Sequence, residues 1–295
     1  SLRKAAEKSY DGYSESAKKI LNYYAEGVNA YIEEAKRDKK LSYEFSLLGY
    51  EPEKWTAIDS LTIGKYMAYD LGGHWDHQSF NNWILNNLGE ENLKQLLPES
   101  FSKNPDSEEI IKANLGANAN INKDTAKVER PPMENGSNDW VVSGKKTKSG
   151  KPLLADDPHL GLSTPSVWYQ MTLSTPDHKV SGVIFPGIPG IILGHNENIA
   201  WGVTNFGPDV QDLYIERRQS DNPYKFEYDG EYYDAQVDKY SIKVKGQDDE
   251  QFEVVNTKHG PIIDFLLKPL GNENTSFSMQ WTALESTQEL EAILN

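Results

Sequence analysis

The sequence predicts an α+β protein in which helices come first and antiparallel strands follow. Three observations support this class. Apolar residues recur at helical spacing up to about residue 97, and short apolar runs bounded by Gly, Pro and Asn dominate from Trp140 onwards. The stretch between them is rich in Asn, Lys, Glu, Ser and Pro and has few large apolar residues, as expected of a spacer. We therefore predict a helical part over 1–97, a spacer over 98–136 and a strand-rich part over 137–295.

The helical part is predicted to contain at least three helices. Residues 1 to about 40 form the first, and Thr56 with Asp59 has the spacing of a capping box that opens the second. Gly72-Gly73 should interrupt that helix, after which Trp75–Leu88 resumes a helical pattern that Leu93–Leu97 extends. The apolar stripe of the first helix consists of Ile20, Tyr23, Tyr24, Val28, Tyr31 and Ile32.

The strand-rich part is predicted to form an antiparallel sheet system. Tyr240–Val244 and Phe252–Val255 alternate apolar and polar residues with a period of two, which is typical of strands with one exposed face. The final stretch, Glu285–Leu294, has a helical pattern. Further strands are expected at Trp140–Val142, Pro152–Ala155, Val167–Leu173, Val180–Phe185, Ile191–Leu193 and Ile199–Val203.

Composition excludes several classes of function. The net charge of the 295 residues is −15, which argues against nucleic-acid and anionic-membrane partners, because both are bound mainly by Lys and Arg. With no Cys, thiolate catalysis and disulfides are excluded. No apolar run approaches the roughly 18 residues of a membrane span, and any export signal is expected to lie outside this chain.

Gly136-Ser137 is the pair on which the functional prediction depends. A Gly-Ser pair is most often a turn. Here it stands between the polar spacer and the strand-like Trp140–Val142, which is how a chain could present one hydroxyl at the beginning of a strand.

Several ordered blocks resemble the penicillin acylase (penicillin amidase) family of N-terminal nucleophile (Ntn) hydrolases. The resemblance covers residues 1 to about 215. It implies the αββα sandwich of these hydrolases, present here only in part, with a helical α-chain part followed by the antiparallel, strand-rich beginning of a β-chain. The matching blocks are Ala25–Tyr31, Leu48–Thr56, Gly136–Trp140, Gly150–Leu160, Gly194–Asn196 and Ile199–Asn205.

The resemblance implies that Ser137 is the nucleophile and that the chain cleaves itself between Gly136 and Ser137. After cleavage, the α-amine of Ser137, with a reference pKa of about 7.7–8, would accept the hydroxyl proton. The backbone N–H of Asn205 is implied as an oxyanion donor. His159 has two interpretations that stay open: a structural residue of an Asp-Pro-His turn, or a catalytic or orienting group, as in acylases related to cephalosporin acylase. His195 is assigned to structure.

The resemblance also implies an apolar acyl pocket and a possible structural calcium site, but no organic cofactor. The Ca²⁺ ligands would be Asp209, Gln211 and Asp212, with Asp76 from the helical part; the alternative is that these are solvated acids. Zinc at His74 and His77 is disfavoured for want of a third ligand. The pocket residues would be Met67, Leu71, Leu160, Ile192, Leu193 and Val203; the alternative, and for any one of them the commoner case, is that the residue simply belongs to the core.

The expected function is hydrolysis of the side-chain amide of penicillins or related N-acyl amines, with the two chains of the processed precursor as partners. An acyl-homoserine-lactone acylase is the alternative within the family. We expect this chain to be an internal piece of an unprocessed precursor, itself neither processed nor active, and the protein to be extracellular or periplasmic. A hypothesis from another class is a secreted carbohydrate- or peptide-binding domain that uses the aromatic residues Trp168, Tyr169, Tyr232 and Tyr233.

Overall fold

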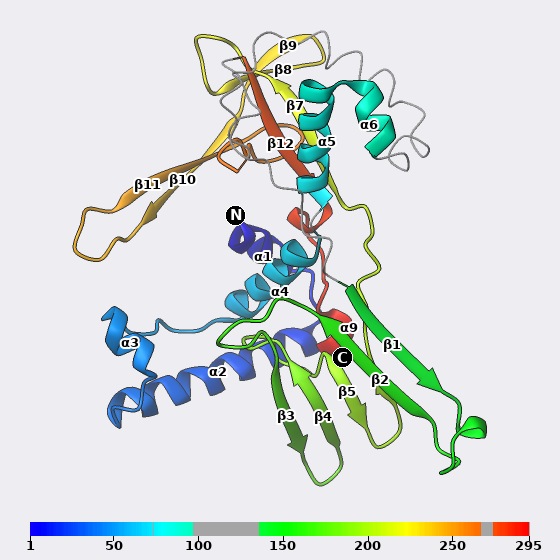
Figure 1. Cartoon of the computed structure of the whole chain (residues 1–295). Helices are drawn as coiled ribbons and strands as arrows, with labels where there is room; N and C mark the ends of the chain where they lie inside the picture. The colour runs from blue at the N-terminus through cyan, green and yellow to red at the C-terminus, as the bar shows by residue number, and fades with distance from the viewer. Residues whose placement is uncertain (73, 97–135, 267–273, 295) are drawn as a thin grey trace. The chain divides into compact units, whose positions relative to one another are not determined.

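The computed structural model describes residues 1–72, 74–96, 136–266 and 274–294. Helices fill the first part of these residues and antiparallel strands the second, which confirms the α+β class (Figure 1). The predicted spacer lies outside the described residues except for Gly136. The helices are α1 (Leu2–Tyr10), α2 (Glu15–Arg37), α3 (Tyr43–Leu48), α4 (Ala57–Gly72), α5 (His74–Leu88), α6 (Glu90–Leu96) and α9 (Glu291–Leu294), with short 3₁₀ helices η1 (Gly144–Lys146) and η2 (Thr282–Leu284).

The strands pair only with antiparallel neighbours and form one four-stranded sheet, β3-β4-β5-β6, and the pairs β1-β2, β7-β12, β8-β9 and β10-β11. None of the helices that the structure describes combines the length and the apolarity needed to cross a bilayer. The strands are β1 (Gly136–Val142), β2 (Leu153–His159), β3 (Tyr169–Ser174), β4 (Lys179–Ile184), β5 (Leu193–Asn196), β6 (Ala200–Trp201), β7 (Gln211–Arg217), β8 (Lys225–Tyr228), β9 (Glu231–Asp234), β10 (Gln236–Ile242), β11 (Glu250–Asn256) and β12 (Thr275–Trp281).

The chain divides into two compact units, each built from more than one stretch. Unit 1 contains α1 to α4, β1 to β6 and α9, and unit 2 contains α5, α6 and β7 to β12. Unit 1 comprises Ser1–Leu71, Met133–Pro208 and Ala283–Asn295; unit 2 comprises Gly72–Pro132 and Asp209–Thr282.

The first predicted helix is in fact two helices, α1 and α2. Ser14, between them, has an extended backbone (φ −61°, ψ 157°), and its hydroxyl accepts a hydrogen bond from the amide of Ala17 at 3.2 Å. This is N-cap geometry, so a new helix starts here. The prediction of continuous helix to about residue 40 is therefore wrong at Asp11–Ser14.

The buried face of α2 is not the predicted stripe of large apolar residues. Tyr23 and Tyr31 are 59% and 65% exposed, and the hydroxyl of Tyr24 accepts a hydrogen bond from the amide of Gly187 at 3.1 Å. The buried positions are mostly alanines, whose small side chains let neighbouring elements approach closely. They are Ala17, Leu21, Ala25 and Ala35.

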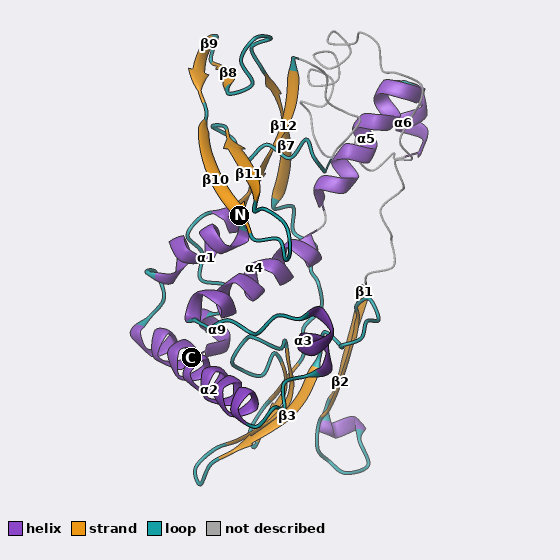
Figure 2. Ribbon diagram, turned by 90° about the vertical axis from the view of Figure 1, so that its left-hand side faces the viewer, coloured by secondary structure: helices purple, strands orange, loops and turns teal. Residues whose placement is uncertain are grey.

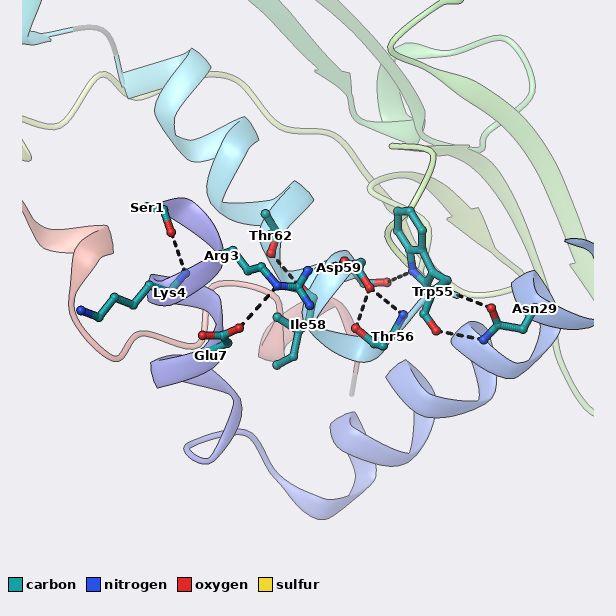
Figure 3. A network of polar contacts seen from close by, with 11 residues as sticks. Ser1, Arg3, Lys4, Glu7, Asn29, Trp55, Thr56, Ile58, Asp59 and Thr62 are labelled. Atoms are coloured by element: carbon teal, nitrogen blue, oxygen red, sulfur yellow. Dashed lines mark hydrogen bonds and ion pairs between the residues drawn. The ribbon is translucent and has the colours of Figure 1, made fainter. Parts of the chain in front are cut away.

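The predicted start of α4 is confirmed (Figure 3). The Asp59 carboxylate accepts hydrogen bonds from the backbone N–H and the hydroxyl of Thr56, at 2.7 and 2.6 Å, and Arg3 Nη1 lies 2.5 Å from its other oxygen. Burial by itself would raise the pKa of Asp59, but the hydrogen bonds from Thr56 and Arg3 outweigh it and hold this pKa below its ordinary value. Asn29 binds both backbone groups of Trp55, at 2.8 and 2.9 Å, which ties α2 to this helix start.

The final helix is much shorter than the predicted Glu285–Leu294, since only α9 is helical there. Thr287 and Glu289 instead bind the ammonium group of Lys65, each at 2.6 Å, and these contacts hold the preceding residues in an irregular path. Side-chain anchoring to α4 therefore overrides the local helical pattern.

The core of unit 1 joins helices, strands and the C-terminal segment. Figure 2 shows α1, α2, α4 and α9 gathered together. The hydroxyl of Tyr13 accepts a hydrogen bond from the amide of Leu290 at 3.2 Å, and burial raises the pKa of Tyr13 to about 12. The buried members of this core are Ala6, Tyr13, Ala17, Leu21, Ala57, Leu61, Met67, Phe185, Ile188, Ile192, Leu193, Leu290 and Leu294.

Most predicted strands of unit 1 coincide with observed ones, but β5 is displaced. It begins at Leu193, where the predicted strand Ile191–Leu193 ends. The carbonyl of Ile191 accepts a hydrogen bond from the indole N–H of Trp201 at 3.2 Å, so a side chain and not a strand ladder binds this group.

Unit 2 contains four strands that the sequence analysis missed: β7, β8, β9 and β12. Polar residues are buried in two of them. Glu216 on β7 is 3% exposed, and its carboxylate accepts a hydrogen bond at 2.7 Å from the hydroxyl of Ser278 on β12, which is fully buried. Burial in these strands therefore includes polar residues that bind one another. β12 nevertheless alternates apolar Phe277, Met279 and Trp281 with polar residues, a period-two pattern from which this strand could have been predicted.

Candidate active site

The strands β1 and β2 place Ser137 on the protected face of a hairpin. Ser137 pairs with Pro158, and Gly136 pairs with His159. Side chains alternate between the two faces of a strand, so Ser137 and Pro158 share one face and His159 lies on the other. Along β2 the residues on the Ser137 face are partly buried, whereas those on the His159 face are exposed. Ser137 itself is partly buried between exposed neighbours.

Ser137 lies on a cavity of about 240 Å³ within unit 1. His159 and Asn205 also line it, so three residues from separate stretches of sequence meet at one place together with Gly136. Most of the remaining wall is apolar. The other lining residues are Leu71, Pro158, Leu160, Trp168, Phe185, Ile192, Val203, Thr204 and Phe206.

Two of the six predicted pocket residues do not line this cavity. Met67, one turn before Leu71 on α4, is 6% exposed and belongs to the core. Leu193 follows Ile192 directly, and consecutive residues of an extended chain point in opposite directions. Leu193 instead lines a second cavity of about 540 Å³. Both residues are members of the buried core of unit 1.

Three aromatic residues of the wall were not predicted as pocket residues: Trp168, Phe185 and Phe206. The rings of Trp168 and Phe185 stack with centroids 4.3 Å apart and an interplanar angle of 24°. The binding-domain hypothesis requires Trp168 to be an exposed aromatic residue, but it is packed into this wall. For Trp168 the sequence shows a tryptophan directly before a strand, and this pattern does not predict which cavity the ring will line.

His159 stands next to the Gly136-Ser137 junction. Its Nε2 lies 3.1 Å from Oδ2 of Asp157, two residues earlier on the same face of β2. Its Nδ1 would lie 3.8 Å from a Cβ placed on Gly136. Asp157 thus binds one ring nitrogen while the other faces the junction. The ring thus lies beside the backbone of Gly136, on the face of the hairpin opposite to the Ser137 side chain, and both interpretations of His159 stay open.

The side chain of Asn205 fixes the loop that follows β6. Its Nδ2 donates to the carbonyl of Leu71 at 2.9 Å, and its Oδ1 accepts from the amide of Gly207 at 2.9 Å. Both polar groups of the Asn205 side chain thus bind the protein, and the predicted role of Asn205 as an oxyanion donor concerns its backbone N–H.

His195 lies on β5, directly before the turn that leads to β6, and its assignment to structure stays a prediction. The turn is stabilised mainly by Asn196, whose Oδ1 accepts from the amides of Asn198 and Ile199, both at 2.8 Å. His195 pairs with Ala200 across β5 and β6.

The predicted calcium residues belong to unit 2. Burial and then the charge of Asp209 raise the pKa of Asp212, so the two carboxylates lie near each other. The carbonyl of Gln211 accepts a hydrogen bond from Gln78 Nε2 at 2.6 Å, and the side chain of Asp76 lies outside the described residues. In the described part of the chain, no group of three or more His, Cys, Asp or Glu side chains converges. These residues therefore meet only part of the six to eight oxygen ligands that Ca²⁺ takes.

The sequence profile described as penicillin amidase matches residues 1–295. An acyl-homoserine lactone acylase of Pseudomonas aeruginosa is 31% identical over 277 residues, covering 90% of this chain and 32% of its own. Penicillin acylase 2 proenzyme of Pseudomonas sp. (strain SE83) is 26% identical over 278 residues, covering 89% of this chain and 35% of its own. A solved penicillin G acylase from Alcaligenes faecalis aligns over 53% of this chain and 30% of its own, with a TM-score of 0.44 and 21% identity.

The chain spans about a third of the length of the curated relatives that it matches. Within that span the family profile matches from the first residue to the last. This chain belongs to the penicillin amidase family.

Proposed function

We propose that the protein is an amidohydrolase that removes an acyl group from an amide nitrogen through an acyl-enzyme on Ser137. The observation that carries this proposal is the apolar cavity on which Ser137, His159 and Asn205 meet. Membership of the penicillin amidase family supports it, since relatives are described as a penicillin acylase and an acyl-homoserine lactone acylase.

The first step would be cleavage of the protein's own chain. Ser137 Oγ attacks the carbonyl carbon of Gly136, the C–N bond breaks, and the nitrogen takes up the hydroxyl proton to become the α-amine of Ser137. Water then hydrolyses the ester and leaves a carboxylate on Gly136. Gly136 suits this attack because it has no Cβ next to its carbonyl and tolerates strained backbone dihedrals.

Turnover would then use the new α-amine as a base. With a reference pKa of about 7.7–8, it is partly neutral near pH 7 and accepts the proton of the Ser137 hydroxyl as Oγ attacks the substrate amide. The backbone N–H of Asn205 would stabilise the oxyanion, a contribution of about 2.7–4 kcal/mol for one such donor. The amine leaves with its proton, and water releases the acid.

The cavity indicates the acyl group. A volume of about 240 Å³ with walls from Leu71, Trp168 and Phe185 suits a compact apolar acyl group, such as an aromatic side chain of a penicillin. The acyl-homoserine lactone is the second candidate, because the relative from Pseudomonas aeruginosa is described as acting on it.

The test uses the complete natural polypeptide, the variant Ser137→Ala and the control Ser143→Ala, which removes a hydroxyl just beyond the far end of β1. We expect intact mass to show two pieces separated between Gly136 and Ser137 for the wild type and the control, and one piece for Ser137→Ala. A hydrolysis panel of penicillins, acyl-homoserine lactones and simple N-acyl amines then identifies the acyl class. Turnover retained by Ser137→Ala would contradict the proposal.

We further propose that Ca²⁺ binds at Asp209 and Asp212. A bound cation would lower the raised pKa of Asp212, because protons and Ca²⁺ compete for the same carboxylate. The affinity for Ca²⁺ should therefore fall as the pH falls towards the pKa of Asp212. Millimolar Ca²⁺ should raise the Tm of the wild type but not of Asp212→Asn, and a chelator should reverse the increase. An equal response in both would place any calcium elsewhere.

Export to the periplasm or the extracellular medium, and the pairing of two chains from one precursor, are proposed on the family resemblance. Cell fractionation followed by mass spectrometry of the mature protein tests both.

A further inference from the structure

Asp156 carries a carboxyl group that the mechanism above does not use. It lies on β2 opposite Asp139, on the same face of the hairpin as Ser137. Both of its carboxyl oxygens are buried, and neither makes a hydrogen bond of good geometry to any residue that the structure describes. Because a buried carboxylate without donors is costly, its presence beside the nucleophile needs a reason.

The carboxyl group lies against the backbone that follows β6. A Cβ placed on Gly202 would lie 2.7 Å from Oδ2 of Asp156 and 2.9 Å from its Cγ and Cβ. Only glycine therefore fits at position 202 without displacing Asp156. The backbone N–H of the next residue, Val203, lies close enough to favour the ionised form of the carboxyl group.

The same segment continues into the wall of the Ser137 cavity. Val203, Thr204 and Asn205 all line that cavity. Beyond Val203, the segment is tied by Asn205 Nδ2 to the carbonyl of Leu71 at 2.9 Å. Asp156 thus contacts the beginning of a short segment that Leu71 holds at the other end, and a shift at Val203 would move the amide of Asn205.

The surroundings of Asp156 disfavour its charge. Burial and then the carboxylate of Asp139 raise the pKa of Asp156, and Asp157 acts in the same direction, whereas the Val203 amide lowers it. The N–H of Val203 therefore favours the ionised form of a carboxylate that burial and two neighbouring acids disfavour.

We propose that Asp156 is a positioning residue of the active site. Its carboxyl group packs against Gly202 and attracts the N–H of Val203, and so sets the backbone from Gly202 to Asn205 with the amide of Asn205 facing the oxyanion formed when Ser137 attacks. This inference rests on the proposed function of Ser137. Asp156 itself touches neither the substrate nor the reacting atoms.

The test compares Asp156→Ala, Asp156→Asn and the control Asp139→Asn in the complete natural polypeptide. Asp156→Ala should lower kcat about tenfold or more with KM changed less than about threefold, because an oxyanion donor acts in the transition state and not on the bound substrate. Asp156→Asn should stay within about threefold of the wild-type kcat, since its amide oxygen can accept the same N–H. Asp139→Asn removes the facing carboxylate but leaves Val203 its acceptor, so its kcat should change less than about twofold.

A second comparison uses Gly202→Ala, whose Cβ would collide with the carboxyl group. Gly202→Ala should lower kcat in the wild type more than it does in Asp156→Ala, which lacks two of the three atoms that the new Cβ would meet. If Asp156→Ala folds poorly, the inference is still tested by two single variants: Gly202→Ala should lower kcat, and Asp156→Asn should not.

The outcomes separate the two proposals. A wild type that neither cleaves itself nor hydrolyses any acyl class overturns the proposed function and this inference with it. A wild type that turns over, with Asp156→Ala within about twofold of its kcat, overturns the role of Asp156 alone. A loss of kcat that accompanies an equal loss in Asp139→Asn, or that Asp156→Asn does not rescue, also overturns it.

Discussion

Removing the carboxylate of Glu289 should destabilise unit 1, because the ammonium group of Lys65 would stay buried without its counter-charge. Lys65 is 1% exposed, and its Nζ lies 2.6 Å from Glu289 Oε1 and 2.6 Å from Thr287 Oγ1. After Glu289→Gln, the two partners of the Lys65 ammonium group are neutral, and they offset less of the free energy that it costs to remove this charge from water.

The geometry sets the size of the effect. Breaking a buried ion pair from one side costs about 3–5 kcal/mol. The side chain of Glu289 is 32% exposed, so water already weakens the attraction, and we expect Glu289→Gln to cost about 2–3 kcal/mol. Lys65→Met removes the charge and keeps an apolar chain of similar length, so it should cost less than about 1 kcal/mol, alone or combined with Glu289→Gln.

Urea unfolding at pH 7, followed by circular dichroism, measures these free energies. Glu285→Gln is the control, because Glu285 is an exposed glutamate four residues earlier in the same segment and should change stability by less than about 0.5 kcal/mol. The reasoning is refuted if Glu289→Gln and Glu285→Gln unfold at the same urea concentration, or if Lys65→Met is the most damaging of the three.

Three further predictions concern stability. Hydrogen bonds hold the pKa of Asp59 below its ordinary 3.8, so the stability that its carboxylate contributes is present above that pH and is lost as the pH falls through the lowered pKa. The Tm difference between the wild type and Asp59→Asn should therefore shrink from pH 7 to about pH 2. A constant difference would contradict this. Leu21→Ala should cost about 2–5 kcal/mol and Ile20→Ala, at a half-exposed position, about 1 kcal/mol or less; equal midpoints in urea would show that the buried face is misassigned. A Cβ on Gly260 would lie 2.0 Å from a carbonyl oxygen of β12, whereas Gly246 has open space, so Gly260→Ala should lower the Tm far more than Gly246→Ala.

Signals that act over a few residues predicted much of the framework. The spacing of Thr56 and Asp59 located the start of α4, since the capping contacts lie within one turn. The period-two pattern likewise located β11, whereas β10 begins at Gln236, four residues before the predicted start at Tyr240. The apolar stripe begins only at Ile20, so it gave no support for a continuous helix across Asp11–Ser14, where Ser14 is a local capping signal.

The candidate site was predictable only as far as its motifs. The resemblance identified Ser137, His159 and Asn205, which the structure brings to one cavity, while their roles stay predictions. The place of Phe185 in the cavity wall and the burial of Asp156 depend on which strands become neighbours and which face of β2 is covered. Tertiary contacts decide both, and no pattern along the sequence contains them.

The return of residues 283–294 to unit 1 affects the order in which the protein can fold during synthesis. The amide of Ser14 donates to Glu291 at 3.1 Å, and the hydroxyl of Ser9 accepts from the amide of Thr287 at 3.3 Å. The partners of these two contacts are separated along the chain by 277 and 278 positions, respectively. Such contacts form only after a long loop closes. The ribosome therefore completes every strand of unit 2 before the first two helices receive their last covering residues, and those helices depend on chaperones or on partial packing until then.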